Sequence, residues 1–204
     1  MARTAFVRLA GAAGIASAAL AVAALAGFVV VVGSDPIADA ATGAGFYVPA
    51  LAALASVALL GLALVGLFLH QEERLGRLGA AAFALALVGT IAAAGAQWTY
   101  VFVVPYFAPV TPELVNESSG SVLAGFVVSY ALLALGWILV GLATLRAGMF
   151  PRWMPLLLVA GAAIAFLPLP SRTLVLTLAA AALGLRLLGR ERTAGRVAPA
   201  PVGR

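Results

Sequence analysis

Cysteine and lysine are absent from the 204-residue sequence, and histidine occurs once, at position 70. Without cysteine, the chain has no disulfide, no thiolate nucleophile and no cysteine-ligated metal or cluster. Without lysine, it cannot form the Schiff base that holds retinal. A single histidine cannot supply a pair of axial ligands for haem. The sequence therefore predicts no cofactor and no metal site.

Charged residues are also scarce: they make up 9% of the chain, whereas soluble domains carry about 25%. Hydrophobic residues make up 64%, and the mean hydropathy is +1.14. A core of this size cannot enclose so much apolar surface, so lipid must be the solvent for much of it. We therefore predict an all-α integral membrane protein. Its net charge of +5 comes from arginines beside apolar segments, which favours membrane topology over nucleic-acid binding.

Six apolar segments follow one another along the chain. They lie near residues 9–33, 46–69, 78–104, 122–145, 153–169 and 173–189. Crossing the hydrocarbon takes roughly 20 apolar residues, with about 17 as the lower limit, so the last two segments sit at that limit. We predict a six-helix transmembrane bundle whose last two segments form a tight spanning hairpin, with a re-entrant pair as the alternative. The first segment exceeds the roughly 7–15 residues of a signal-peptide core, so we expect it to be retained.

Arginines lie before the first segment, in the second and fourth loops and in the tail, so they fall on one side of the predicted membrane. Arg172, in the fifth loop, is the one exception. The positive-inside rule therefore predicts an N-in/C-in topology, with both termini in the cytoplasm. The use of arginine alone for positive charge is typical of GC-rich bacterial genomes. Together with the six apolar segments, it predicts a multi-pass protein of the bacterial cytoplasmic membrane. The predicted domains are a single transmembrane domain over residues 1–189 and a basic, disordered cytoplasmic tail over residues 190–204.

The stretch HQEERLGR, residues 70–77, holds the only histidine and two of the seven acidic residues. Its Glu72-Glu73-xxx-Arg77 pattern resembles the EExxxR motif of CAAX-protease-like intramembrane peptidases. Those enzymes also need histidines on later helices, and none follows here. A turn between two membrane helices explains the stretch better, with Glu73 and Arg77 paired at i, i+4 spacing. We therefore predict no catalytic residue.

The segment WTYVFVVPYFAPVTPELVNE, residues 98–117, combines aromatic residues, three prolines and two glutamates on the predicted outer side. It predicts an interfacial aromatic belt, followed by a short surface helix that Thr111 caps and Pro112 begins. The alternative is a lid over a lipid or a small apolar ligand. In that alternative the ligand-facing residues are Gln97, Trp98, Tyr100, Tyr106, Glu113 and Glu117.

The segment LVGLATLRAGMFPRWM, residues 139–154, resembles a pattern in many small multi-pass membrane proteins of GC-rich bacteria. In that pattern a helix is followed by Leu-Arg-Ala-Gly, and Pro-Arg-Trp opens the next helix. Those proteins are uncharacterised, so the resemblance implies a topology and no activity.

No apolar segment carries a charged residue in its middle, where ion-coupled transporters and proton pumps usually place one. The leading hypothesis is therefore a non-catalytic membrane component: an accessory subunit, or a small sensor or binder of lipid-like molecules. The alternative is a small transporter or a substrate-binding membrane subunit, and the second alternative is a membrane enzyme. The predicted partners are the lipid bilayer and either another membrane protein or further copies of this chain, with no nucleic acid.

Overall fold

The computed structural model describes residues 2–117, 120–167 and 172–196. These residues form helices and turns without any strand, which confirms the all-α prediction. The elements are α1 (Ala2–Val31), α2 (Ile37–Ala41), the 3-10 helix η1 (Ala44–Phe46), α3 (Tyr47–Phe102), α4 (Val104–Phe107), α5 (Pro112–Asn116), α6 (Gly120–Ala147), α7 (Trp153–Ala165) and α8 (Leu174–Arg196).

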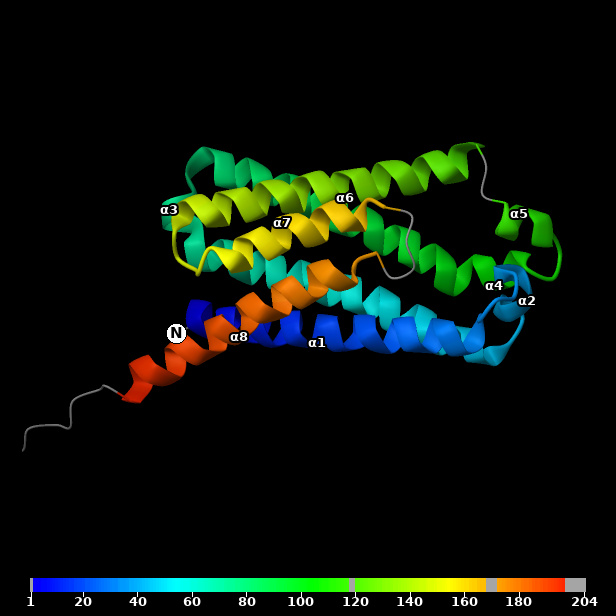
Figure 1. Cartoon of the computed structure of the whole chain (residues 1–204), viewed down its shortest axis with the longest axis horizontal. Coiled ribbons are helices and arrows are strands. Elements are labelled where there is room, and N and C mark those ends of the chain that lie inside the picture. Colours follow the sequence, from blue (N-terminus) through cyan, green and yellow to red (C-terminus); the bar gives the residue numbers. More distant parts are fainter. Residues whose placement is uncertain (1, 118–119, 168–171, 197–204) are drawn as a thin grey trace, which may run out of the picture.

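Helix α3 consists of two arms that meet at Gly76 and run back along each other (Figure 1). Gly76 has a φ of 59° and a ψ of −164°, a conformation that glycine adopts easily because it lacks a Cβ. The first arm covers residues 47–75 and the second covers 77–102. Together with α1 and α6, these two arms run the length of the bundle (Figure 1).

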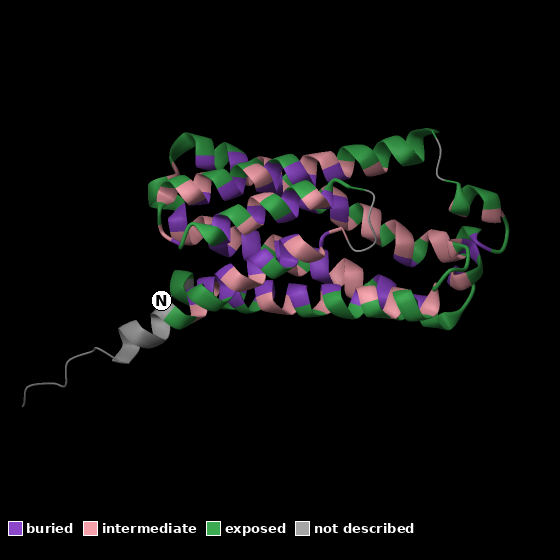
Figure 2. Cartoon of the chain, in the orientation of Figure 1, coloured by how far each residue is buried: buried purple, intermediate pink, exposed green. Residues whose placement is uncertain are grey.

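Three helical stretches are long and apolar enough to cross a membrane: Arg3–Val31, Ala44–Phe107 and Pro112–Ala147. Their outward faces expose large apolar side chains such as Ile91, at 64%, and Val128, at 57%. Figure 2 shows buried residues where the helices face one another and exposed residues along the outside. This arrangement suits a protein in a membrane, because lipid can solvate such faces and water cannot.

Small residues allow the helices to pack closely. A Cβ on Gly136 of α6 would overlap the backbone of Ala86 in the second arm of α3. A Cβ on Gly184 of α8 would likewise overlap the backbone of Gly11 in α1. Membrane helices gain much of their association energy from such close contact, because the lipid chains are as apolar as the helices.

Buried hydroxyl and indole groups join the helices by hydrogen bonds. The hydroxyls of Ser17 and Ser56 each donate to the other residue's carbonyl at 2.8 Å, which connects α1 to the first arm of α3. Trp137 Nε1 donates to Thr90 Oγ1 at 3.0 Å, which connects α6 to the second arm. These bonds satisfy polar groups that lipid could not satisfy.

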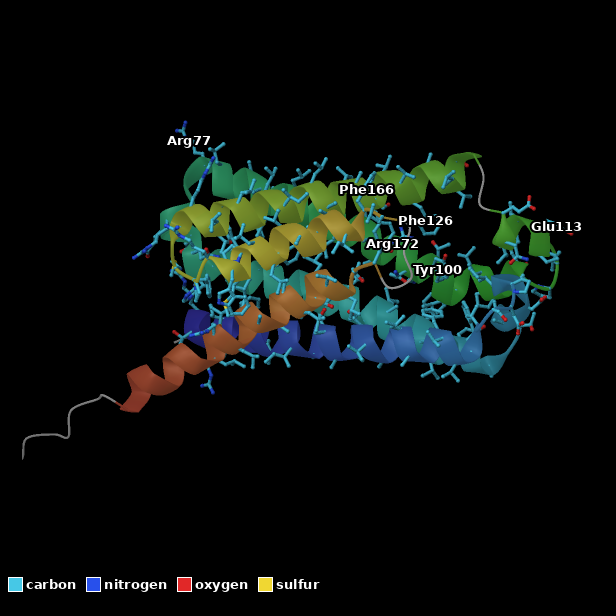
Figure 3. The ribbon with its side chains drawn as sticks, viewed as in Figure 1. Arg77, Tyr100, Glu113, Phe126, Phe166 and Arg172 are labelled. Carbon is cyan, nitrogen blue, oxygen red and sulfur yellow. The ribbon has the colours of Figure 1, made fainter. Side chains whose placement is uncertain are left out.

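Most of the described arginines lie at one end of the bundle, together with Glu72 and Glu73, and the other four described carboxylates lie at the opposite end. The start of α1, the turn at Gly76 and the α6–α7 loop lie at one end, and α2, α4 and α5 lie at the other. We call the first the arginine end, defined by Arg3, Arg74, Arg77, Arg146 and Arg152. We call the second the acidic end, defined by Asp35, Asp39, Glu113 and Glu117. Figure 3 shows Arg77 and Glu113 at these opposite ends.

The last two apolar segments form shorter helices than the others. Helix α7 has 13 residues, which span about 20 Å, whereas the hydrocarbon core of a bilayer is about 30 Å thick. Six crossings are therefore not confirmed. Helices α7 and α8 form a hairpin, and Phe166 and Arg172, on either side of its bend, lie partway along the bundle (Figure 3). We call the described residues beside the bend, 166–167 and 172–173, the hairpin tip. Helix α8 continues to Arg196, into the tail where disorder is predicted, and residues 197–204 lie outside the described residues.

Residues 70–77, where the sequence predicts a turn, do not contain the predicted ion pair between Glu73 and Arg77. Gly76 interrupts the helix between Glu73 and Arg77, and these two side chains form no ion pair in the described structure. Instead, Arg3 Nη1 lies 2.9 Å from Glu72 Oε1, and Arg3 also donates to the carbonyl of Leu69. The end of the first arm of α3, just before the turn at Gly76, is thus joined to the start of α1.

Replacing Glu72 by glutamine should lower the free energy of unfolding by no more than about 0.5 kcal/mol, because exposed ion pairs contribute little. The Arg3 and Glu72 side chains keep 50% and 38% of their surface exposed. The melting temperature in detergent measures the effect, with Glu73→Gln as the matched control. A loss several times that of the control would mean that the turn depends on this pair.

Candidate ligand-binding cavity

A partly open cavity of about 370 Å³ lies in the half of the bundle next to the acidic end, and its lining includes the exposed side chain of Val29. Its walls are mostly apolar and come from α1, α2, η1 and the first arm of α3. The largest of these side chains are Leu25, Phe28, Val29, Ile37 and Phe46. Its polar groups come from α3, α6 and the start of α8. They belong to Ser56, Gln97, Tyr100, Tyr130, Arg172 and Thr173.

The cavity exists because the α7–α8 hairpin is short. Helix α8 packs against α1, α7 packs against α6, and the two helices pack against each other. The hairpin therefore fills the space between α1 and α6 in the half next to the arginine end (Figure 1). Beyond its tip, α1 and α6 flank a space backed by the two arms of α3, and the cavity-lining residues lie on these helices.

Ile37 of α2 and Phe46 of η1 line the cavity toward the acidic end. The ring of Phe46 is fully buried and meets Phe28 edge-on, with the ring centroids 5.7 Å apart. The backbone N–H of Ala38 in α2 donates to Asn116 Oδ1 in α5 at 3.0 Å. Aromatic packing and this hydrogen bond hold the short helices over the ends of α1 and α3.

The polar groups meet at the tip of the hairpin, around Tyr130. Its hydroxyl accepts a hydrogen bond from Gln97 Nε2 at 3.0 Å. The guanidinium carbon of Arg172 lies 4.0 Å from the centre of the Tyr130 ring, a cation–π contact. Tyr100 packs against Phe126 with the ring centroids 6.0 Å apart, and Figure 3 shows both near Arg172.

Arg172 lies at an intermediate depth, away from both ends of the bundle. Its partner Tyr130 is roughly 15 Å from the start of α6 at Gly120, taking about 1.5 Å per residue. Figure 3 shows Arg172 between Arg77 at one end and Glu113 at the other. Among the described side chains, no carboxylate forms an ion pair with Arg172. A cation at this depth of a membrane protein is costly and marks a functional site by default.

The structure divides the six residues predicted to face a ligand. Gln97 and Tyr100 line the cavity. Trp98 and Tyr106 point outward, with exposed fractions of 51% and 72%. Glu113 and Glu117 are exposed at α5, and Figure 3 shows Glu113 far from Arg172.

The short surface helix forms where the sequence predicts it, with Thr111 as its N-cap and Pro112 as its first residue. The predicted capping bond is absent, because the Thr111 hydroxyl donates back to the Phe107 carbonyl at 3.5 Å. Thr111 therefore joins α5 to the turn of α4 before it.

Sequence reasoning missed Tyr130, Arg172 and Thr173 as cavity residues. Tyr130 lies in a long apolar run that offers no sign of its neighbours. Arg172 did carry a signal, since it is the one arginine that breaks the alternation of charge. Arg172 lies between the last two apolar segments rather than in the middle of one, and it lines the cavity because this part of the hairpin lies away from both ends of the bundle.

The polar groups of the cavity are hydroxyl, amide and guanidinium groups. Among the described residues, no histidine or carboxylate lines it, and the Ser56 hydroxyl is bonded to the Ser17 carbonyl. The described residues contain no cluster of histidine and carboxylate side chains that would hold a metal ion.

No family model matches the chain, and no curated protein or solved structure does so either.

Proposed function

We propose that this protein is a non-catalytic integral membrane protein that binds a lipid-like molecule in the cavity beyond the hairpin tip. The cavity itself carries the proposal: it combines a volume of about 370 Å³, apolar walls and one polar end. Ligand sites typically occupy about 300–1,000 Å³ and have this mixture of apolar surface and a few placed polar groups. A few polar groups at one end of an apolar cavity are what a binding site uses to orient its ligand.

We also propose that the arginine end faces the cytoplasm of a bacterial cell, so that the topology is N-in/C-in. Helices α1 and α6 and the two arms of α3 cross the membrane. The α7–α8 hairpin enters from the cytoplasmic side and returns to it. The described arginines gather at the arginine end, which also holds Glu72 and Glu73, and none of them lies at the acidic end; this bias of arginine supports the orientation. In this proposal the last two apolar segments form the re-entrant pair, the alternative to a spanning hairpin.

A small transporter is the second candidate, and Arg172 is the observation that favours it, since transporters place charges at mid-depth. Transport would require the hairpin to move. Gly14 of α1 lies close to both Ala180 of α8 and Ala63 of α3, so these three helices are closely packed between the cavity and the arginine end. Binding is therefore the function that the geometry favours.

Filling the cavity should abolish ligand binding. Ala24 of α1 lines the cavity and is 4% exposed, so Ala24→Phe would place a ring in the ligand's space. Binding of radiolabelled palmitate to purified protein, in nanodiscs of zwitterionic lipid, should weaken at least ten-fold. Ala23→Phe, on the exposed face of the same helix, is the matched control and should bind as the wild type does.

A second filling variant protects this test against misfolding. Ala53→Phe introduces the ring from α3, on another wall of the cavity. The melting temperature of each variant shows whether it remains folded. The proposed function is overturned if the wild type binds no single-chain probe, or if folded Ala24→Phe and Ala53→Phe proteins bind palmitate as the wild type does.

A further inference from the structure

The positive charge of Arg172 has no counterpart in the described part of the cavity. Its guanidinium is half-buried and stacks on Tyr130, and no described carboxylate forms an ion pair with it. Stacking engages the face of the guanidinium and leaves N–H groups at its edge free to donate. An uncompensated cation in a low-dielectric setting is unfavourable, so an anion delivered there gains strong, charge-assisted hydrogen bonds.

Tyr130 supplies a second donor at the same place. Its hydroxyl accepts the bond from Gln97 Nε2, which leaves its own proton available for an acceptor in the cavity. Arg172 and Tyr130 lie in direct contact and both line the cavity. Two adjacent donors of this kind suit an acceptor with two oxygens, such as a carboxylate or a phosphate.

The apolar part of the cavity runs from this polar end toward the acidic end. Along α1, which ends at Val31, its lining extends from Ala21 to Val29, a distance of about 12 Å at 1.5 Å per residue. Phe28, Ile37 and Phe46 surround its far end. A volume of about 370 Å³ suits one acyl chain and is small for the two chains of a phospholipid.

We propose that the cavity binds a single-chain amphiphile with an anionic head group, a carboxylate or a phosphate. Arg172 and Tyr130 hold the head group at the hairpin tip, and the chain extends along α1 toward Phe46. This inference rests on the proposed lipid-binding function and adds the charge and the orientation of the ligand. It also explains why an arginine occupies the tip of the hairpin, where the alternation of charge predicts none.

The test compares ligands that share a chain and differ in the head group. Wild-type protein in zwitterionic nanodiscs is titrated with palmitate, hexadecyl phosphate, hexadecanol and inorganic phosphate. We expect palmitate or hexadecyl phosphate to bind at least ten-fold more tightly than hexadecanol, and the tighter of the two identifies the head group. Inorganic phosphate alone should bind weakly, because it lacks the chain. This comparison requires no mutation.

Substitution of Arg172 then locates the effect. Arg172→Gln should reduce the affinity for the anionic ligand to that for hexadecanol and leave hexadecanol binding unchanged. Arg186→Gln, an exposed position of α8 that lies outside the cavity, is the control of equal charge change and should bind as the wild type does. Arg172→Lys keeps the charge but loses the two-pronged donor, so an intermediate affinity is expected.

The outcomes separate this inference from the proposed function. Equal affinity for palmitate, hexadecyl phosphate and hexadecanol, with binding still lost in Ala24→Phe, would overturn the anionic head group and leave lipid binding intact. A preference for anions that persists in Arg172→Gln would overturn the role of Arg172. Inorganic phosphate that binds as tightly as hexadecyl phosphate would show a site for a free anion and would overturn the amphiphile.

Discussion

Replacing Gly136 by alanine is expected to destabilise the protein by about 2–3 kcal/mol, the cost of overpacking a closely packed interface. At this position α6 touches the second arm of α3, and a Cβ would overlap the backbone of Ala86. The two helices would have to separate. Separation would stretch the bond from Trp137, the residue after Gly136, to Thr90, which lies one turn after Ala86. The melting temperature in detergent should fall by roughly 5–10 °C.

Two glycines on the same helices provide matched controls. Gly125 lies on α6 and Gly95 on the second arm of α3, and a Cβ at either position meets no described atom within 4 Å. Alanine is favoured over glycine in a helix by up to about 1 kcal/mol, so neither Gly125→Ala nor Gly95→Ala should lower the melting temperature. Equal melting temperatures for Gly136→Ala and Gly125→Ala would mean that α3 and α6 do not pack at Gly136.

The long apolar runs predicted the helices because helix formation in such segments depends on local composition. The four longest runs became α1, the two arms of α3 and α6. The turn near residue 76 was also predictable, since charged residues gather there between two apolar runs. The ion pair within it was not, because it depends on how the chain bends at Gly76 and on the distant Arg3, which takes Glu72 as its partner.

The cavity was only half predictable, because it depends on contacts between residues far apart in the sequence. Gln97 and Tyr100 stood out as polar groups at the end of an apolar run. Tyr130 and Arg172 come from other helices, and their contact exists only because the hairpin tip stops beside the middle of α6. Composition could not place that tip, since the apolar segments 153–169 and 173–189 lie at the length limit between spanning and re-entrant helices.

The depth of the hairpin tip also connects the fold to the proposed ligand. A hairpin that crossed the whole membrane would carry Arg172 to the outer surface, where water and counter-ions would screen its charge. A hairpin that stops inside keeps the guanidinium among apolar walls, where an anion binds far more strongly. The proposed site therefore requires a buried tip, and labelling of the tip tests this requirement without any ligand.

Cysteine introduced at the tip of the hairpin should resist labelling from outside the cell. The chain has no cysteine of its own, so a single Leu167→Cys substitution gives one reactive group. Leu167 follows the end of α7 and is 46% exposed, so in a buried tip its side chain would face lipid. Thiols in lipid stay protonated and react slowly with maleimides, which require the thiolate. A membrane-impermeant maleimide should therefore label less than about a tenth of the Leu167→Cys protein in intact cells, and all of it after denaturation.

Two further cysteines fix the orientation in the same experiment. Glu113→Cys at the acidic end should react completely in intact cells, and Arg77→Cys at the arginine end should react only after the membrane is opened. If Leu167→Cys reacts as fast as Glu113→Cys, the hairpin crosses the membrane and Arg172 lies at the outer surface. If Arg77→Cys reacts in intact cells and Glu113→Cys does not, the bundle has the opposite orientation. A protected tip between two accessible ends is the result that a buried Arg172 requires.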